Sequence, residues 1–466
     1  MSFKIQAAAL IVAFLAFCSI SQAEEKPSVP WNIHDTIGLP YWLQFSIKHR
    51  SRYETLDNAF RRGANGSDQV LAFRTTVFAQ AAYENFRIGG EFIDSRIALD
   101  DTGTPVSTTL VNEVELLQAY LAWDSQDFLG TGLEAYAKGG RQTLDFGSRR
   151  LIARNRYRNT INAFTGIDFN LQETGNWQWR SFFVLPVTRL PNGRASINRG
   201  AIEFDAEAFD IYFTGTFLGL DNLPIQTQGE VYLYYLNERD TQHALTKNRD
   251  IFTPGIRWYR EPVTGQFDFE LETVLQVGTS RATRSTMDTT DLNHFAYFGH
   301  AALGYTFNYP WKPRFILQYD YASGDKDPND GKNGRFETLY GARRFEFGPT
   351  SIWGAFARAN ISSPGYRIKI KPHQGLSVFL AHRAFWLAEK RDTWTGARLH
   401  DSTGQSGDFI GHQLEIRMRW EVAPKLATLE TGWAHLFKGE FAKNAPGSPA
   451  DKDDSDYFYV QTSLHF

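Results

Sequence analysis

The amino-acid sequence predicts a single-chain, antiparallel transmembrane β-barrel of about 18 strands, within a range of about 16 to 20. Three observations support this fold class: a C-terminal segment that alternates apolar and polar residues, further segments with the same alternation, and an N-terminal segment typical of secreted proteins. In the C-terminal segment, Phe458, Val460, Thr462 and Leu464 alternate with side chains that can face water. Such a strand presents one face to hydrocarbon and the other to an aqueous interior.

The final residue, Phe466, also indicates the compartment. A closing strand that ends on phenylalanine resembles the C-terminal signature of bacterial outer-membrane proteins. We therefore expect the chain to lie in the bacterial outer membrane, with Phe466 recognised by the barrel assembly machinery.

The N-terminal segment reads as a secretory signal peptide. Lys4 precedes an apolar run at 7–17, and Ser21-Gln22-Ala23 provides small residues for cleavage. The run is too short for a membrane-spanning helix, and the residues on either side of it are not those that flank such a helix. We expect a signal peptide at residues 1–23 and an outer-membrane β-barrel domain at residues 24–466.

The composition agrees with a barrel and excludes several other functions. Mean hydropathy is −0.39, although 42% of residues are hydrophobic and 15% are aromatic. One lipid-facing side per strand and a polar interior give this mixture. The 49 basic and 52 acidic residues leave a net charge of −3, which argues against a nucleic-acid binder. Cys18 is the only cysteine and lies in the predicted signal peptide, so the mature chain would have no disulfide or cysteine metal site.

The alternation is clearest in the segments 41–54, 266–277 and 413–420. Except for His49, every charged residue of 41–54 falls on one face of the expected strand. Alternation also fits a soluble antiparallel sheet, but the strand lengths approach the ~9–11 residues of a membrane strand. Further strands are expected near 69–83, 86–97, 113–124, 132–142, 159–170, 176–188, 198–206, 208–217, 228–238, 250–260, 293–307, 313–322, 350–360, 374–387 and 427–438. Glu207 would occupy a short periplasmic turn, and long polar connections would form external loops.

Several motifs occur in an order and spacing found in a known family. They are Gly140-Arg141-Gln142-Thr143-Leu144, Phe385-Trp386 after His382-Arg383, Ile410-Gly411-His412-Gln413-Leu414-Glu415, Phe437-Lys438 before an acidic loop, and the terminal Phe466. The first looks like Gly-Arg-Gln-x-Leu and the third resembles Ile-Gly-Gln-Glu-Leu-Asp of the alginate export proteins. The resemblance implies an 18-stranded outer-membrane barrel that exports an alginate-like polyuronate, together with periplasmic secretion partners.

Strand parity also identifies residues that would line the lumen. An anionic polysaccharide carries one carboxylate per sugar, and a pore that conducts it needs many weak basic sites. Arginine suits this role because its planar fork binds a carboxylate through two hydrogen bonds. The candidates are Lys48, Arg50, Arg52, Arg74, Arg87, Arg180, Arg417 and Arg419 by parity, Arg141 from the family-like motif, and Glu415 as an acidic partner. Diffusion porins also line their lumens with arginines facing carboxylates, so structural ion pairing is an equal alternative for each arginine.

The sequence gives little support for catalysis, and we expect neither enzymatic activity nor a cofactor. It has no Gly-x-Ser-x-Gly elbow, His-Glu-x-x-His motif, phosphate loop or dinucleotide fingerprint. The segment 325–331 loosely resembles a calcium loop but lacks its central glycine and terminal glutamate, which favours an acidic external turn. The external loops would face lipopolysaccharide and outer-membrane lipid.

The favoured hypothesis is therefore an outer-membrane channel that passes an anionic polysaccharide outward. The principal alternative is an uptake porin for small anionic or sugar solutes, because sequence does not give the direction of transport. A third hypothesis is a barrel with a closed lumen and adhesive or enzymatic loops.

Overall fold

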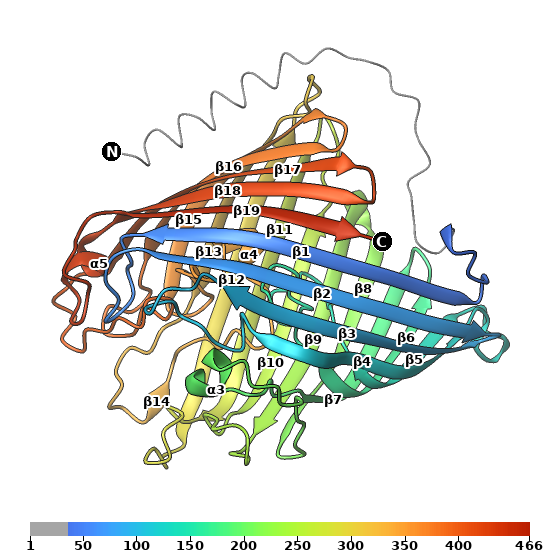
Figure 1. Cartoon of the computed structure of the whole chain (residues 1–466), viewed down its shortest axis with the longest axis horizontal. Coiled ribbons are helices and arrows are strands. Elements are labelled where there is room, and N and C mark those ends of the chain that lie inside the picture. The colour runs from blue at the N-terminus through green and yellow to red at the C-terminus, as the bar shows by residue number, and fades with distance from the viewer. Residues whose placement is uncertain (1–35) are drawn as a thin grey trace. The chain divides into compact units, whose positions relative to one another are not determined.

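The computed structural model describes residues 36–466, so the predicted signal peptide lies outside the described residues. The chain forms one large antiparallel sheet that closes on itself (Figure 1). Its strands are β1 (Leu43–Asp57), β2 (Asp68–Tyr83), β3 (Phe86–Ala98), β4 (Asn112–Ser125), β5 (Glu134–Gln142), β6 (Phe164–Glu173), β7 (Trp177–Pro186), β8 (Ile211–Leu223), β9 (Thr227–Glu238), β10 (Asp250–Arg260), β11 (Phe267–Ser280), β12 (Leu292–Thr306), β13 (Arg314–Ala322), β14 (Lys332–Asn333), β15 (Ile361–His373), β16 (Leu376–Trp386), β17 (Phe409–Ala423), β18 (Ala427–Lys438) and β19 (Ser455–His465). The short helices are η1 (Phe128–Gly130), α3 (Arg194–Asn198), η2 (Pro224–Gln226), α4 (Arg344–Phe347) and α5 (Glu440–Asn444).

Pairing of β1 with β19 closes the ring. The antiparallel register runs from Lys48 opposite His465 to Asp57 opposite Asp456. The two-residue β14 is an exception, since it pairs in parallel with β12, while β13 pairs directly with β15. The other 18 strands make the closed antiparallel barrel that the sequence predicts. Closure removes the sheet edges, whose unpaired backbone groups would be costly in lipid.

The connections alternate in length. Tight turns, such as those at 84–85 and 374–375, join strands at the end of the barrel where β1 begins and β19 ends. The long connections lie at the opposite end. In outer-membrane barrels the short turns face the periplasm and the long loops face outward. The end that carries the long connections is therefore the external one.

The strands bury polar side chains and expose apolar ones, the reverse of a soluble sheet. On β11, Leu271 and Leu275 are exposed, whereas Asp268, Glu272 and Gln276 are buried in the interior. An outward apolar band around a polar interior is the pattern of a lipid-embedded barrel. In the described residues, no helix has both the length and the apolar character needed to span a membrane.

Two long connections fold into the barrel. They are segment A (143–163), between β5 and β6, and segment B (334–360), between β14 and β15. A parallel bridge joins Ile152 to Tyr340, and the Tyr340 amide donates to the Leu151 carbonyl at 2.9 Å. A β-carbon at Gly341 would overlap the Arg150 carbonyl oxygen, so this close approach requires glycine.

The structure corrects two of the expected strands and one expected turn, and it adds a strand that was not expected. Residues 198–206 lie in the long connection 187–210 rather than in a strand, and Glu207 is in that connection rather than in a short turn. Ile202 and Phe204 alternate as a strand would, but β7 and β8 pair directly and leave this segment no partner strand. Residues 350–360 belong to segment B, where burial is continuous from Ile352 to Asn360. Sequence reasoning missed β15 because Pro364-Gly365 reads as a turn. Pro364 is tolerated because the β15–β16 ladder has no pairing at that position.

Candidate functional site: the charged interior of the barrel

The arginines predicted on β1 and β2 hold segment A. Arg50 donates to the carbonyls of Arg156, Tyr157 and Arg158 at 3.1, 2.9 and 3.0 Å. Arg52 donates to the Tyr157 carbonyl at 2.8 Å and Arg74 to the Arg158 carbonyl at 2.9 Å. Three inward guanidinium groups thus bind the backbone of one short stretch of the segment.

Arg50 and Arg52 are buried beneath this segment, with 4% and 0% of their surfaces exposed. Arg52 also pairs with Glu54 at 2.6 Å and lies over the Tyr157 ring at 4.3 Å. In this conformation these two arginines are anchors for segment A, while their charge contributes to the field in the lumen.

Three other predicted arginines have acidic partners on the wall. Arg87 pairs with Asp124. Arg141 pairs with Glu115 at 2.7 Å and Glu207 at 2.8 Å, and Arg180 pairs with Asp168 at 2.6 Å. The contacts of these three arginines are therefore structural ion pairs, the alternative to substrate contact.

The predicted residues on β17 have differing partners. Glu415 pairs with Arg344 of α4 at 2.6 Å, and Arg419 pairs with Glu430 at 2.8 Å. Arg417 lies over the Phe379 ring at 4.7 Å and makes no ion pair among the described residues. Lys48 of β1 is exposed, and among residues 36–466 it makes no ion pair.

Several interior cations were missed from the sequence. Arg367 and Lys369 lie on β15, whose strand was not predicted. Arg344 and Arg358 lie on segment B, whose inward course leaves no periodic signal. The alternation of Glu270 and Glu272 with apolar residues along β11 did indicate that these two acids face the interior, where they pair with Arg150.

Arg150 lies at the centre of a buried ion-pair network. It pairs with Glu270 at 2.5 Å, and also with Glu272 and Glu346. Glu346, on segment B, also binds Arg358. Segments A and B are thereby fixed to each other and to β11, because separating them would leave buried charges without partners.

A second part of the network joins β12, β13 and β16. Asp320 accepts from His300 at 2.8 Å and from Arg383 at 2.8 Å. The ligand atoms of His300, Asp320 and Glu346 lie within 4.8 Å of one another, a spacing that could hold a metal. The two carboxylates are already bonded to arginines, so this donor set fits an ion-pair network better than a divalent cation.

Charge is unevenly distributed over the inner wall, although Arg257 lies among the acidic strands and Glu54 and Glu415 lie on the basic ones. Acidic residues gather on β9 to β11 and include Glu230, Asp268, Glu270 and Glu272. Basic residues gather on the basic wall, which we define as the inward cations of β15, β17, β1 and β2: Arg367, Lys369, Arg417, Arg419, Lys48, Arg50, Arg52 and Arg74. The acidic strands lie halfway around the ring from β19 and β1. An anion in the lumen would therefore be attracted to one side.

Asp205 and Glu337 are among the carboxyl groups outside the spanning strands that have shifted pKa values. Burial raises the pKa of Asp205, in the external connection 187–210, to about 6, with nearby Glu115 adding to the effect. Burial would also raise the pKa of Glu337, on segment B, but Arg249 and Lys247 lower it to about 2. Lys247 and Arg249 lie 2.9 and 3.1 Å from the Glu337 carboxylate and tie segment B to an external loop.

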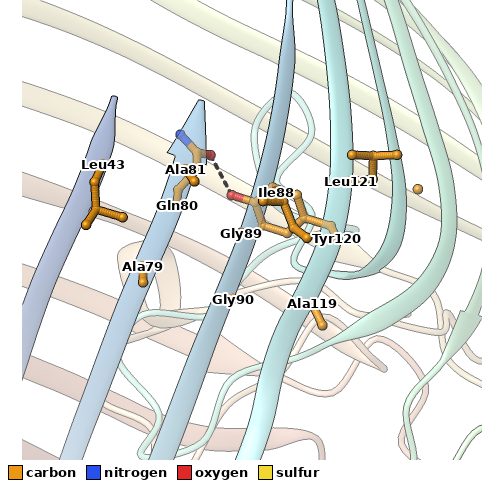
Figure 2. A pocket seen from close by; sticks show the side chains of 11 residues that line it. Leu43, Ala79, Gln80, Ala81, Ile88, Gly89, Gly90, Ala119, Tyr120 and Leu121 are labelled. Atoms are coloured by element: carbon orange, nitrogen blue, oxygen red, sulfur yellow. Dashed lines mark hydrogen bonds between the residues drawn. The ribbon is translucent and has the colours of Figure 1, made fainter. Parts of the chain in front are cut away.

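A shallow groove marks the outer face near the periplasmic end of β1 to β5 (Figure 2). Small residues, among them Ala79, Gly90 and Ala119, form its floor. Tyr120 donates to Gln80 at 2.8 Å behind this floor. The lining is almost wholly apolar, so the groove belongs to the lipid-facing surface rather than to the charged pathway.

A closed barrel with an apolar outer band and a polar, ion-paired lumen defines a porin-like outer-membrane channel. The chain belongs to the alginate export family, whose model, described as "Alginate export", matches residues 41–454. This confirms the resemblance noted in the sequence and supports an outer-membrane location. No curated protein sequence matches the chain.

Solved structures support the fold independently. Pseudomonas aeruginosa OpdK, solved with vanillate, aligns with a TM-score of 0.57 and 11% identity over 91% of this chain and 98% of its own. Acinetobacter baumannii OccAB3 aligns with a TM-score of 0.57 and 12% identity over 91% and 99%. P. aeruginosa OpdQ aligns with a TM-score of 0.56 and 12% identity over 91% of this chain and 97% of its own. At these identities the similarity concerns the fold.

Proposed function

We propose that this protein is a passive outer-membrane channel for carboxylate-bearing anions. The observation that carries the proposal is the basic wall, which faces an acidic wall across the lumen. Lys48, Lys369 and Arg417 of this wall make no ion pair within residues 36–466. Cations that are not neutralised attract anions, and several modest sites in sequence allow an anion to enter and leave.

The inward segments favour small solutes. Segments A and B lie inside the barrel and are held by buried ion pairs and backbone hydrogen bonds, so they narrow the path beside the basic wall. The OpdK structure contains vanillate, and a small organic carboxylate of that kind suits the chemistry of this lumen.

Export of a polyuronate is the second candidate function, and the family match favours it. A polyuronate is a series of carboxylates, so the basic wall would serve it by the same chemistry. The substrates of the two candidate functions differ in size rather than in the kind of charge they carry. The sequence-based hypothesis of polysaccharide export thus remains a proposal beside that of small-solute passage.

Single-channel recording of the refolded protein in a planar bilayer tests the proposal. We expect a reversal potential that shows anion selectivity, and we expect uronate monomers to reduce this current. Cation selectivity would refute the proposal. A series of oligouronates separates the candidates: passage of long oligomers favours polymer export, whereas passage of monomers alone favours small solutes.

Replacing Arg50, Arg52, Arg417 and Arg419 together with alanine should lower anion selectivity. Because Arg50 and Arg52 also anchor segment A, conductance should rise as well. Replacing the outward-facing Arg96 with glutamine is the matched control and should leave both quantities unchanged. Unchanged selectivity in the fourfold variant would exclude the assigned role of these residues.

A further inference from the structure

One part of the basic wall differs from the rest of the interior. Arg367 of β15 and Arg417 of β17 both lie over the ring of Phe379 on β16, at 4.9 and 4.7 Å. Lys369 is the cross-strand partner of Phe379. Two guanidinium groups therefore lie over one aromatic ring, and an inward lysine is opposite that residue on the next strand. We call Phe379 and these three cations the Phe379 cluster.

No carboxylate is paired with the Phe379 cluster within residues 36–466, although acidic groups lie near it. Each nearby acid is bound to another cation: Glu415 to Arg344 at 2.6 Å, Glu430 to Arg419 at 2.8 Å, and Asp268 to Arg314. Among the described residues, the cluster therefore has acidic neighbours but no carboxylate in direct ion-pair contact with its three cations.

The ring explains how these cations are kept in place. At Arg141, Arg150 and Arg180 a carboxylate both orients the guanidinium group and neutralises it. A cation–π contact orients a guanidinium group but leaves its charge and its N–H donors available. Phe379 thus replaces a carboxylate partner without removing the affinity for an anion.

The donors of the cluster are also incompletely used. Arg367 donates through Nη1 to the Phe345 carbonyl at 2.7 Å, while its buried Nε has no partner. Among the described residues, Lys369 and Arg417 make no hydrogen bond. A buried donor without an acceptor is costly, and an anion in the lumen could accept from the Arg367 Nε as well as from the partly exposed Lys369 and Arg417.

We propose that the Phe379 cluster is a binding site for small di- or tricarboxylates. Three adjacent positive charges match a solute with two or three carboxylates better than one with a single carboxylate. The site rests on the proposed channel function and names a solute class that this function would favour.

Citrate and acetate are suitable probes for the full-length wild-type channel in a bilayer. We expect citrate to block the anion current at much lower concentration than acetate. Replacing Lys369 and Arg417 with glutamine should weaken citrate block by about tenfold or more, since each charged hydrogen bond is worth about this factor. Arg96→Gln is the control, because Arg96 faces outward on β3 and lies outside the basic wall.

The role of the ring has its own test. Phe379→Leu should weaken citrate block while leaving all three charges in place, and Phe379→Trp should restore it. Equal block by citrate and acetate, or citrate block unchanged in the Lys369/Arg417 variant, would overturn the site. If the wild type is anion-selective in that case, the channel function stands and the site alone is wrong.

A measurement on the wild-type protein avoids dependence on folding of the variants. Citrate should protect the Lys369 amino group from acylation, because a bound carboxylate holds it as the unreactive ammonium; mass spectrometry of the full-length protein detects the modification. Lys332, which is exposed on β14, should be acylated at the same rate with and without citrate. Equal protection of both lysines, or of neither, contradicts the proposed site.

Discussion

Replacing Glu346 with glutamine tests how segment B is held inside the barrel. Glu346 is 4% exposed and lies between Arg150 and Arg358, which are also buried. The substitution keeps the shape of the side chain but removes its charge. Arg150 retains Glu270 and Glu272, whereas Arg358 retains only carbonyl acceptors, those of Ala342 at 2.7 Å and Arg150 at 3.2 Å.

The expected loss is about 3 kcal/mol, the lower end of the 3–5 kcal/mol seen when one partner of a buried pair is removed. The lower end applies because only Arg358 loses its sole carboxylate. Since about 1.4 kcal/mol corresponds to a factor of ten, the open state of segment B should become roughly a hundredfold more populated.

Hydrogen exchange of the backbone amides measures this opening directly. The Tyr340 and Ala342 amides donate to the Leu151 and Arg149 carbonyls, so their exchange should accelerate by roughly a hundredfold. Single-channel conductance should become larger or noisier in the same variant.

Two further variants make the test specific. Asp94→Asn breaks an exposed pair with Arg96, worth about 0–1 kcal/mol, and should not change these amides. Methionine at both 346 and 358 should be less disruptive than the single glutamine, because no buried charge is then left without its partner. Wild-type exchange rates in Glu346→Gln would refute the assignment of this network as the support of segment B.

Three other predictions concern pH and close packing. The folded pKa of Asp205 is raised to about 6 by burial, so its contribution to stability is fully present below the unfolded value of about 3.9 and is lost as pH rises toward 6. Thermal melts of the wild type from pH 4 to 7 should show this slope, and Asp205→Asn should flatten it. Glu337 behaves in the opposite way, because its folded pKa is lowered to about 2. Its contribution is present above the unfolded value of about 4.3 and is lost as pH falls toward 2, so Glu337→Gln should lose stability at pH 7 but little at pH 2. Gly341→Ala places a β-carbon against the Arg150 carbonyl, and it should destabilise the bridge by about 1–3 kcal/mol, detected as faster exchange of the Tyr340 amide.

The barrel could be predicted from the sequence because its signal is repeated in every spanning strand. Each strand must place apolar residues toward lipid and polar residues inward, so the parity of β1, β11 and β17 was readable residue by residue. The errors occurred where this constraint is relaxed. Ile202 and Phe204 alternate without a partner strand, and Pro364-Gly365 gives a turn signal within a true strand.

The interior could be predicted only in part. Parity placed Arg50 and Arg52 on the inward face, but it could not show that they bind the backbone of segment A. That contact joins residues more than a hundred positions apart, and segments A and B have no periodic pattern because they are buried on several sides. That Arg50, Arg52 and the other predicted lumen residues contact a passing solute remains a proposal.

The bridge between Ile152 and Tyr340 has a mechanical consequence. Segment A leaves the ring after β5 and segment B re-enters it at β15, so their union forms a strut across the inside of the cylinder. A strut makes the cross-section resist flattening by the surrounding bilayer. It also couples distant parts of the wall, and substitutions at Arg50 and Glu346 should therefore combine non-additively although they lie on different segments.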